Sequence, residues 1–183
     1  MDAADNGDRE QKAEDLVEEE WQEGKRREEQ AEIIVSDDPQ ALGIVEGFRI
    51  DSLSMRDGDT GELFWQEDEW ADDLFDDELE AHLPVEILER DSVSREIVFT
   101  SRSEIKALRL SQKLILNGVA IEQWHFHFGF VIPGSTNSWT QTIAGADHRI
   151  EASVLSGNLL IETSFYDGNL FLCKCVVRIF YDL

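Results

Sequence analysis

The sequence predicts an all-β domain, either a sandwich or a barrel, that follows an acidic N-terminal extension. Short stretches with alternating apolar and polar residues recur along the later part of the chain. Turn signals such as Asn117-Gly118, Ser156-Gly157 and Asp167-Gly168 separate them. Residues 1–46 differ in composition, with sixteen acidic and five basic residues and few strongly apolar ones. A chain of 183 residues has room for one domain of ordinary size and an extension.

The extension, residues 1–46, has too few apolar side chains to offset the entropy lost on ordering, so we expect it to be disordered. The alternative is a partly helical segment, because Arg9 to Ala31 holds good helix formers with Leu16, Val17 and Trp21 at helical spacing. The extension is then a solubilising arm or a contact arm for a basic partner. Residues 47–183 form the predicted domain.

The net charge of -24 argues against binding to nucleic acid or to an anionic membrane through a basic face, and favours basic partners. No apolar run approaches the roughly 20 residues of a membrane span, and the start of the chain lacks the features of a secretory signal. We therefore expect a soluble intracellular protein. Cys173 and Cys175 lie too close in sequence to staple a fold, which fits a reducing cytosol.

The domain begins with a predicted hairpin. Phe48 to Met55 is a strand of alternating apolar and polar residues, in which the apolar side chains change from one face to the other near the middle. Arg56 to Gly61 is a turn, and Glu62 to Gln66 is the returning strand. Glu67 to Glu80 contains nine acidic and no basic residues, which indicates an irregular loop or a short helix. A solvated face is favoured there over a calcium site, because the EF-hand pattern is absent.

The remaining strands follow at regular spacing, which is typical of a sandwich or a barrel. One exception is Ser103 to Leu110, where Glu104, Ala107, Leu108 and Leu110 suggest one or two helical turns. The expected strands are Val85–Arg90, Val93–Thr100, Lys113–Leu116, Val119–Ile132, Ser138–Ile143, Asn158–Phe165 and Leu170–Tyr181.

The stretch from Glu122 to Trp139 contains aromatic residues at alternate positions before Pro133-Gly134 ends the strand. In an extended strand these residues share one face, and the two histidines share the other. The aromatic set is Trp124, Phe126, Phe128 and Phe130. It predicts one apolar wall, which faces either a filled core or a pocket.

Motifs for catalysis or metal binding have little support. His125 and His127 could form half of a zinc or copper site, but no further ligand stands at a recognisable spacing, so two histidines on the wetter strand face is the simpler interpretation. Cys173 and Cys175 fit an inert apolar core. The chain shows no phosphate loop and no nucleophile elbow. We expect no catalytic residues, no metal and no cofactor.

Polar residues on apolar strand faces are more informative. Arg95 alternates with Val93, Ile97 and Phe99, so its guanidinium must be paired or meet a ligand. Gln112 and Glu122 present the same anomaly at strand starts. These residues indicate either a buried Arg–Glu pair or a mostly apolar pocket with a few orienting polar groups.

Ordered blocks of sequence closely resemble the phosphodiesterase delta subunit family, also called prenyl-binding protein delta, from about Gly47 to Tyr181. The elements FGFVIP and STNxW, with WQ and ETxF, separate the chain from the related acyl-binding Unc-119 branch. The blocks are GFRIDSLSMRD, TGELFWQ, LPVEIL, VSREIVF, EQWHFHFGFVIPGSTNSW, ASVLSGN, IETSFYD and VRIFY.

The resemblance implies an immunoglobulin-like β-sandwich of about eight or nine antiparallel strands that encloses a hydrophobic lipid pocket. It places Arg95, Gln112 and Glu122 near the polar end of a bound prenyl group. The other implied pocket residues are Leu53, Met55, Trp65, Ile87, Ile97, Trp124, Phe126, Ile143, Leu155, Ile161, Val177, Ile179 and Tyr181. Arg90 and Arg149 stand where family members have small or apolar residues, and the loop from Ala144 to Glu151 is more polar than expected.

The resemblance also implies a function, that of a non-enzymatic carrier in the cytoplasm, and in the cilium or flagellum. Its cargo would be farnesylated or geranylgeranylated Ras-, Rho- or Rab-type small GTPases and prenylated phosphodiesterase subunits, extracted from membranes or solubilised without stable membrane insertion. GTP-bound Arf-like small GTPases would release the cargo by pairing with an exposed strand edge. Two alternatives stay open: a protein-interaction sandwich with a filled core that binds basic partners, and a carrier of acyl lipids.

Overall fold

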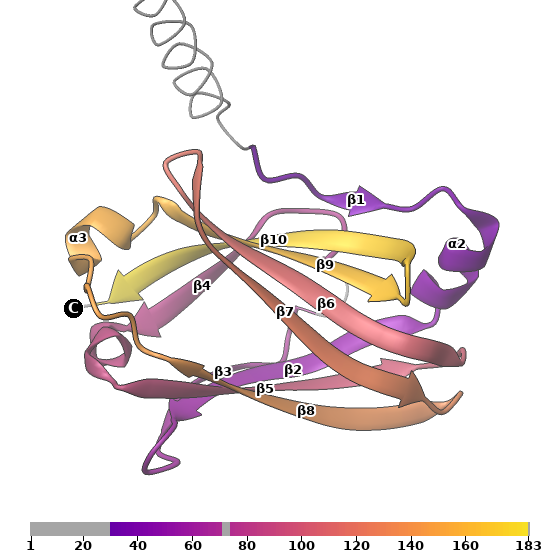
Figure 1. Cartoon of the computed structure of the whole chain (residues 1–183), viewed down its shortest axis with the longest axis horizontal. Coiled ribbons are helices and arrows are strands. Elements are labelled where there is room, and N and C mark those ends of the chain that lie inside the picture. Colours follow the sequence, from indigo (N-terminus) through magenta and orange to yellow (C-terminus); the bar gives the residue numbers. More distant parts are fainter. Residues whose placement is uncertain (1–29, 71–73, 183) are drawn as a thin grey trace, which may run out of the picture. The chain divides into compact units, whose positions relative to one another are not determined.

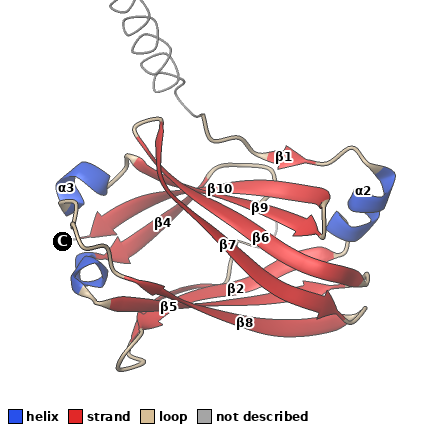
Figure 2. Cartoon of the chain, viewed as in Figure 1, coloured by secondary structure: helices blue, strands red, loops and turns tan. Residues whose placement is uncertain are grey.

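The computed structural model describes residues 30–70 and 74–182 (Figures 1 and 2). The first half of this part contains β1 (Ile34–Val35), α2 (Pro39–Val45), β2 (Phe48–Asp57), β3 (Leu63–Glu67), β4 (Leu79–Pro84), the 3-10 helix η1 (Val85–Glu89) and β5 (Ser92–Ser101). The second half contains β6 (Ile105–Leu116), β7 (Val119–Val131), β8 (Ser135–Ala144), α3 (Ala152–Leu155), β9 (Leu159–Asp167) and β10 (Leu170–Asp182). No helix within the described ranges is both long and apolar enough to cross a membrane.

The strands form two separate sheets that pack face to face. One sheet has the order β1-β10-β9-β6-β7, with β4 also paired to β10, and the other has the order β3-β2-β5-β8. The pairings are antiparallel, apart from the parallel pairing of β4 with β10. Of the two architectures predicted, the all-β sandwich is therefore confirmed over the barrel.

Part of the predicted extension packs against the sandwich. β1 pairs with β10, and α2 begins after Asp38, whose side chain accepts hydrogen bonds from the backbone N–H groups of Gln40 and Ala41. Ala41 and Ile44 of α2 are buried in the core. Residues 1–29 lie outside the described residues, as does most of the segment for which the helical alternative was considered. The boundary at residue 46 stays a prediction.

The first hairpin forms as predicted, and one later strand does not. β2 and β3 pair. A register shift between Ile50 and Ser52 changes which side chains of β2 point inward, as the predicted shift of face required. The predicted strand Val85–Arg90 is wrong, because Pro84 ends the ladder and η1 follows directly. The strand lies just before it, in β4, which begins inside the segment expected to be an acidic loop or short helix.

The predicted helical turns at Ser103 to Leu110 are also wrong, since β6 begins at Ile105. Ile105 pairs with Val131 and Leu108 with Gly129, so Lys106 and Ala107 together face one residue of β7. This β-bulge brings Ile105 and Leu108 onto the same buried face although they are three residues apart. A spacing of three imitates the periodicity of a helix, which explains the error.

The predicted single face for four aromatic residues of β7 is wrong at Phe130. Gly129 has φ of 101°, a backbone conformation that L side chains rarely adopt, and it interrupts the alternation. Phe130 is consequently 56% exposed, whereas Val131 is fully buried. Trp124, Phe126 and Phe128 keep the inward face.

An aromatic cluster fills the half of the sandwich beside α2. Phe48 lies 5.8 Å from Phe99 and 5.4 Å from Phe165 between ring centroids, which joins the two sheets. Phe128 contacts both Phe99 and Trp139, at 5.2 Å and 5.4 Å. We call these five residues the aromatic plug. Its rings are tilted or edge-on, the arrangements that aromatic pairs prefer.

Replacing Gly129 with alanine should destabilise the protein by about 1–3 kcal/mol, because the added Cβ penalises the positive φ of the bulge. Gly43→Ala is the matched control: it lies in α2 with open space around the added Cβ and should stabilise the protein slightly. Urea unfolding of both variants measures the difference. Equal effects of the two substitutions would contradict the role of the bulge.

Candidate binding pocket

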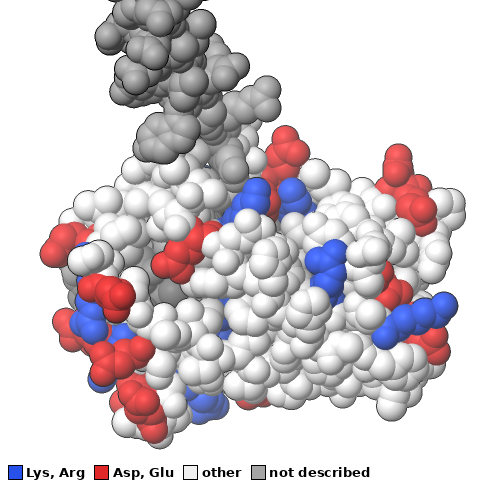
Figure 3. All heavy atoms as spheres, viewed as in Figure 1, with Lys and Arg blue, Asp and Glu red and all other residues white. Residues whose placement is uncertain are grey.

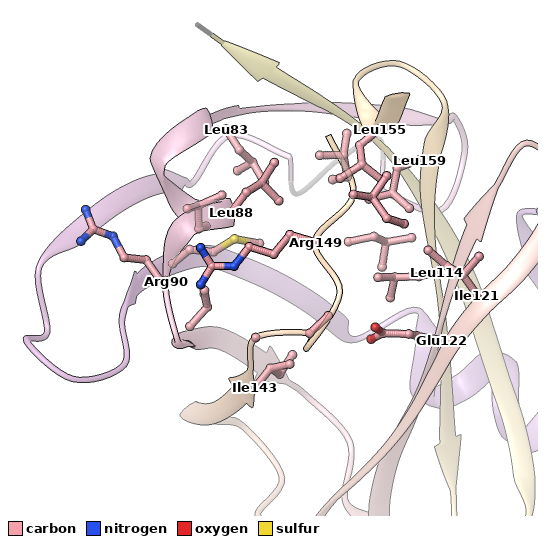
Figure 4. Close-up of a pocket in the computed structure, with 18 of the residues that line it drawn as sticks. Leu83, Leu88, Arg90, Leu114, Ile121, Glu122, Ile143, Arg149, Leu155 and Leu159 are labelled. Carbon is pink, nitrogen blue, oxygen red and sulfur yellow. The ribbon is translucent and has the colours of Figure 1, made fainter. Parts of the chain in front are cut away.

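The half of the sandwich opposite the aromatic plug holds an unfilled cavity of about 250 Å³ between the two sheets. Figure 4 shows Leu83, Leu88, Leu155 and Leu159 on one side of its opening and Ile143 and Glu122 on the other. The apolar lining also includes Met55, Ile87, Val93, Leu114, Ile121, Trp124, Ile161, Ile179 and Tyr181. We call this space the outer cavity.

A smaller inner cavity of about 70 Å³ continues toward the aromatic plug. It shares Met55, Arg95, Ile161 and Ile179 with the outer cavity, so the two spaces form one slot. Its other lining residues are Ile50, Leu53, Trp65, Trp70, Leu74, Ala81, Ile97, Gln112, Thr163, Phe165, Cys175 and Val177. The slot ends at Phe165, which belongs to the plug.

A loop passes over the open end of the outer cavity. Residues 145–150, here the mouth loop, leave β8 of one sheet and lead to α3, which packs on β10 of the other sheet (Figure 1). The N–H of Gly145 donates to the carbonyl of Asp91 at 2.7 Å, which fixes the start of the loop. Apart from Asp147, every residue of the mouth loop lines the outer cavity.

Arg95 lies where the two cavities meet and is only 6% exposed. One terminal nitrogen of its guanidinium donates to Oε1 of Gln141 at 3.2 Å, while its Nε has no hydrogen-bond partner. The guanidinium carbon lies 5.4 Å from the ring centroid of Trp124 and 5.6 Å from that of Phe126. Burial lowers the pKa of Arg95 to about 10. Since Arg95 pairs with an amide, the predicted Arg–Glu pair is wrong.

Other buried polar groups also retain hydrogen-bonding capacity. Gln112 donates to the hydroxyl of Thr163 at 2.9 Å, yet its Oε1 has no partner. Nε2 of Gln141 likewise has none. Because buried polar atoms are normally satisfied, the unpaired atoms of Arg95 and Gln112, which both line the slot, suggest that water or a ligand completes them.

Three charged side chains line the outer cavity close to solvent. Glu122 is exposed on β7, and Arg149 projects from the mouth loop. Arg90 is the third: its Nε lies 3.6 Å from Asp57 and its guanidinium carbon lies 4.9 Å from the centre of the Phe64 ring. The outer cavity therefore combines apolar walls with a polar mouth.

Nearly all of the residues proposed from the resemblance lie along this slot. Leu53, Trp65, Ile97, Gln112 and Val177 line the inner cavity, and Ile87, Glu122, Trp124, Ile143, Leu155 and Tyr181 line the outer one, with Met55, Arg95, Ile161 and Ile179 shared. Phe126 is the exception, because it packs against the core cluster beside the plug. Whether these residues bind lipid stays a prediction.

Several lining residues were missed from the sequence. Leu114 and Leu159 lie two positions from Gln112 and Ile161, so strand alternation could have identified them. The mouth loop has no such signal, because loops lack periodicity. Gln141 lines neither cavity but holds Arg95, and it was missed because it stands between two threonines, whose polarity conceals that it points inward.

The histidine pair lies apart from the slot, and of the cysteine pair only Cys175 lines the inner cavity. His125 and His127 are exposed on the outward face of β7. No group of three or more His, Cys, Asp or Glu residues within the described part of the chain could hold a metal ion. Cys173 and Cys175 are buried, and burial raises the pKa of the Cys175 thiol to about 12, which agrees with an inert core.

Because Arg95 pairs with Gln141, mutations of the two residues should change the free energy of unfolding in a strongly non-additive way. Arg95→Met leaves a buried amide without its partner and should cost about 1–3 kcal/mol, while Gln141→Leu leaves a buried charge without its hydrogen bond and should cost at least as much. The double variant removes both polar groups and should unfold within about 1 kcal/mol of the wild type. Urea unfolding tests this cycle, and a double variant as unstable as the sum of the singles would refute it.

Comparison with known families agrees with this geometry. A model of the family described as "GMP-PDE, delta subunit" matches residues 43–181, which includes both sheets from β2 onward and the whole slot. The match spans well over half of the chain. The protein therefore belongs to the GMP-PDE delta-subunit family.

Proposed function

We propose that the protein is a non-enzymatic carrier that shields the prenyl group of lipidated membrane proteins in the slot between its sheets. The observation that supports this proposal most is the slot itself. Sandwich sheets usually interlock their side chains at about 10 Å separation, whereas here an apolar space remains unfilled. The alternative of a filled core that serves only protein contacts has less support for the same reason.

The energetics favour an exchange between two apolar environments. Each buried CH₂ of a lipid anchor contributes about 0.8 kcal/mol to membrane binding, so only a comparably apolar cavity can compete for the chain. Aliphatic residues from both sheets line the outer cavity, which is open at its mouth. A farnesyl or geranylgeranyl chain would lie lengthwise, with its modified cysteine at the polar mouth.

The surface around the mouth suggests cargo with a basic tail. Glu86, Glu89, Asp91, Asp147 and Glu151 are exposed next to residues that line the outer cavity. Figure 3 shows acidic side chains, with some basic ones among them, at the end of the domain where α3 and the β2–β3 hairpin lie. Such a surface attracts polybasic chains electrostatically. We therefore propose prenylated Ras-, Rho- and Rab-type GTPases, and prenylated phosphodiesterase subunits, as cargo.

Release of cargo would use an exposed sheet edge. β7 and β8 each stand at the end of their sheet, so their outer backbone groups are available to a further strand. We propose GTP-bound Arf-like small GTPases as the releasing partners, and trafficking through the cytoplasm and the cilium or flagellum as the setting.

The carrier function is tested by the binding of a fluorescent farnesylated peptide. Saturable binding is expected in the wild type. Ile161→Trp should weaken it on the order of tenfold, because the larger ring displaces about two methylene groups of the chain from the slot. Ile132→Trp, at a 63% exposed position outside both cavities, is the matched control and should bind normally. Absence of saturable binding in the wild type would refute the proposal.

Competition between lipids separates the prenyl carrier from an acyl carrier. The sequence blocks resemble the prenyl-binding family and not its acyl-binding Unc-119 relatives. A farnesylated peptide should therefore displace the fluorescent probe at lower concentration than a myristoylated peptide of the same sequence. Stronger competition by the myristoylated peptide, measured by fluorescence polarisation, would favour the acyl carrier instead.

A further inference from the structure

Arg149 extends across the mouth of the outer cavity. Its backbone belongs to the mouth loop, and its side chain reaches toward the segment that carries Leu88 and Arg90 (Figure 4). There its terminal nitrogen lies 3.5 Å from Oδ1 of Asp91, the residue that precedes β5. A chain that enters the slot through this opening must therefore pass the Arg149 side chain.

The ion pair that holds Arg149 in this position is weak. The distance of 3.5 Å exceeds the 2.7–2.9 Å typical of charge-assisted hydrogen bonds. The side chains of Arg149 and Asp91 are 51% and 90% exposed, so solvent screens their attraction. Exposed pairs of this kind contribute about 0–1 kcal/mol. Asp91 is thus a partner that Arg149 can exchange for another carboxylate at low cost.

The other two arginines that line the outer cavity are less suited to this exchange. Arg90 is held beside Asp57 and over the Phe64 ring, and its guanidinium points away from the other labelled side chains in Figure 4. Arg95, which the resemblance places near the polar end of the lipid, is instead buried deep in the slot, at the junction with the inner cavity. Arg149 is therefore the arginine placed to meet the polar end of a molecule whose apolar chain fills the slot.

We propose that Arg149 determines cargo specificity by exchanging Asp91 for a carboxylate at the polar end of the bound lipid, so that a prenylcysteine with a free α-carboxylate is preferred over its methyl ester. This inference rests on the proposed carrier function. The planar guanidinium can bind both carboxylate oxygens at once, whereas a methyl ester is uncharged and offers weaker acceptors.

Because Glu122 opposes the binding of an anion, Arg149 decides whether the free acid or the methyl ester binds more tightly. Its carboxylate also lines the outer cavity and repels an anionic lipid end. With Arg149 present, attraction offsets this repulsion. Without Arg149, the repulsion alone remains, and the neutral methyl ester should become the better ligand. The preference should therefore invert, rather than only weaken, when Arg149 loses its charge.

The experiment compares three fluorescent peptides that share one sequence and carry S-farnesylcysteine. The first ends in a free carboxylate, the second in a methyl ester, and the third in a methyl ester with a glutamate before the cysteine. Wild-type protein should bind the free acid about three- to fivefold more tightly than the ester. Arg149→Gln should bind the ester more tightly, and Arg149→Lys should keep part of the original preference.

Two controls make the result specific. Arg49→Gln removes an exposed, ion-paired arginine outside both cavities and should retain the wild-type ratio. In the wild type, 1 M NaCl should reduce the ratio toward one, because salt screens an exposed pair. The third peptide shows whether Arg149 recognises the terminal carboxylate or an acidic side chain near it.

A ratio of free acid to ester that is the same in wild type and Arg149→Gln would overturn this inference while leaving the carrier function intact. A wild type that does not bind the free acid more tightly than the plain ester would overturn it as well, even if the peptide with the glutamate bound more tightly. Failure of all three peptides to bind would instead refute the carrier function, and the inference with it.

Discussion

The slot depends on the aromatic plug at one end of the sandwich. Phe48, Phe99 and Phe165 join the two sheets through tilted rings beside α2, and Phe128 and Trp139 extend the contact along β7 and β8. These large side chains fill the space between the sheets where they pack. The shorter aliphatic residues in the other half do not fill that spacing. One well-packed half therefore supports an unfilled half within the same fold.

Burial of Arg95 carries a cost that ordinary packing does not require. A guanidinium in a low-dielectric interior needs compensation, and here it donates one hydrogen bond to Oε1 of Gln141 and lies over the faces of two aromatic rings. Its Nε stays unpaired. A sandwich selected for stability alone would place an apolar residue at this position. This cost supports the proposal that the slot holds a ligand, which Arg95 would serve.

Strand alternation was enough to predict an all-β fold, because most strands have one buried face, but it left a sandwich and a barrel both open, and only the family resemblance favoured the two-sheet sandwich. It failed where the backbone departs from regular pairing. The β-bulge in β6 gave Ile105 and Leu108 a helix-like spacing, and the positive φ of Gly129 turned Phe130 outward. The strand β4 was hidden by the acidic residues 76–78 that precede it and by Glu80 on its solvent side. The residues of the mouth loop could not be assigned to the pocket, because their position depends on the crossing from β8 to α3, which local sequence does not encode.

The strand β8 connects the outside of the protein to the site. It is an edge strand, so its outer backbone is open to a partner, and its inward side chains include Gln141, which holds Arg95, and Ile143, which lines the outer cavity. The mouth loop follows directly at its end. If a partner strand pairs with this edge, as proposed for the release of cargo, it would bind the same strand that positions the buried arginine and leads into the loop that carries Arg149. The proposed release would then need no contact between the partner and the lipid itself.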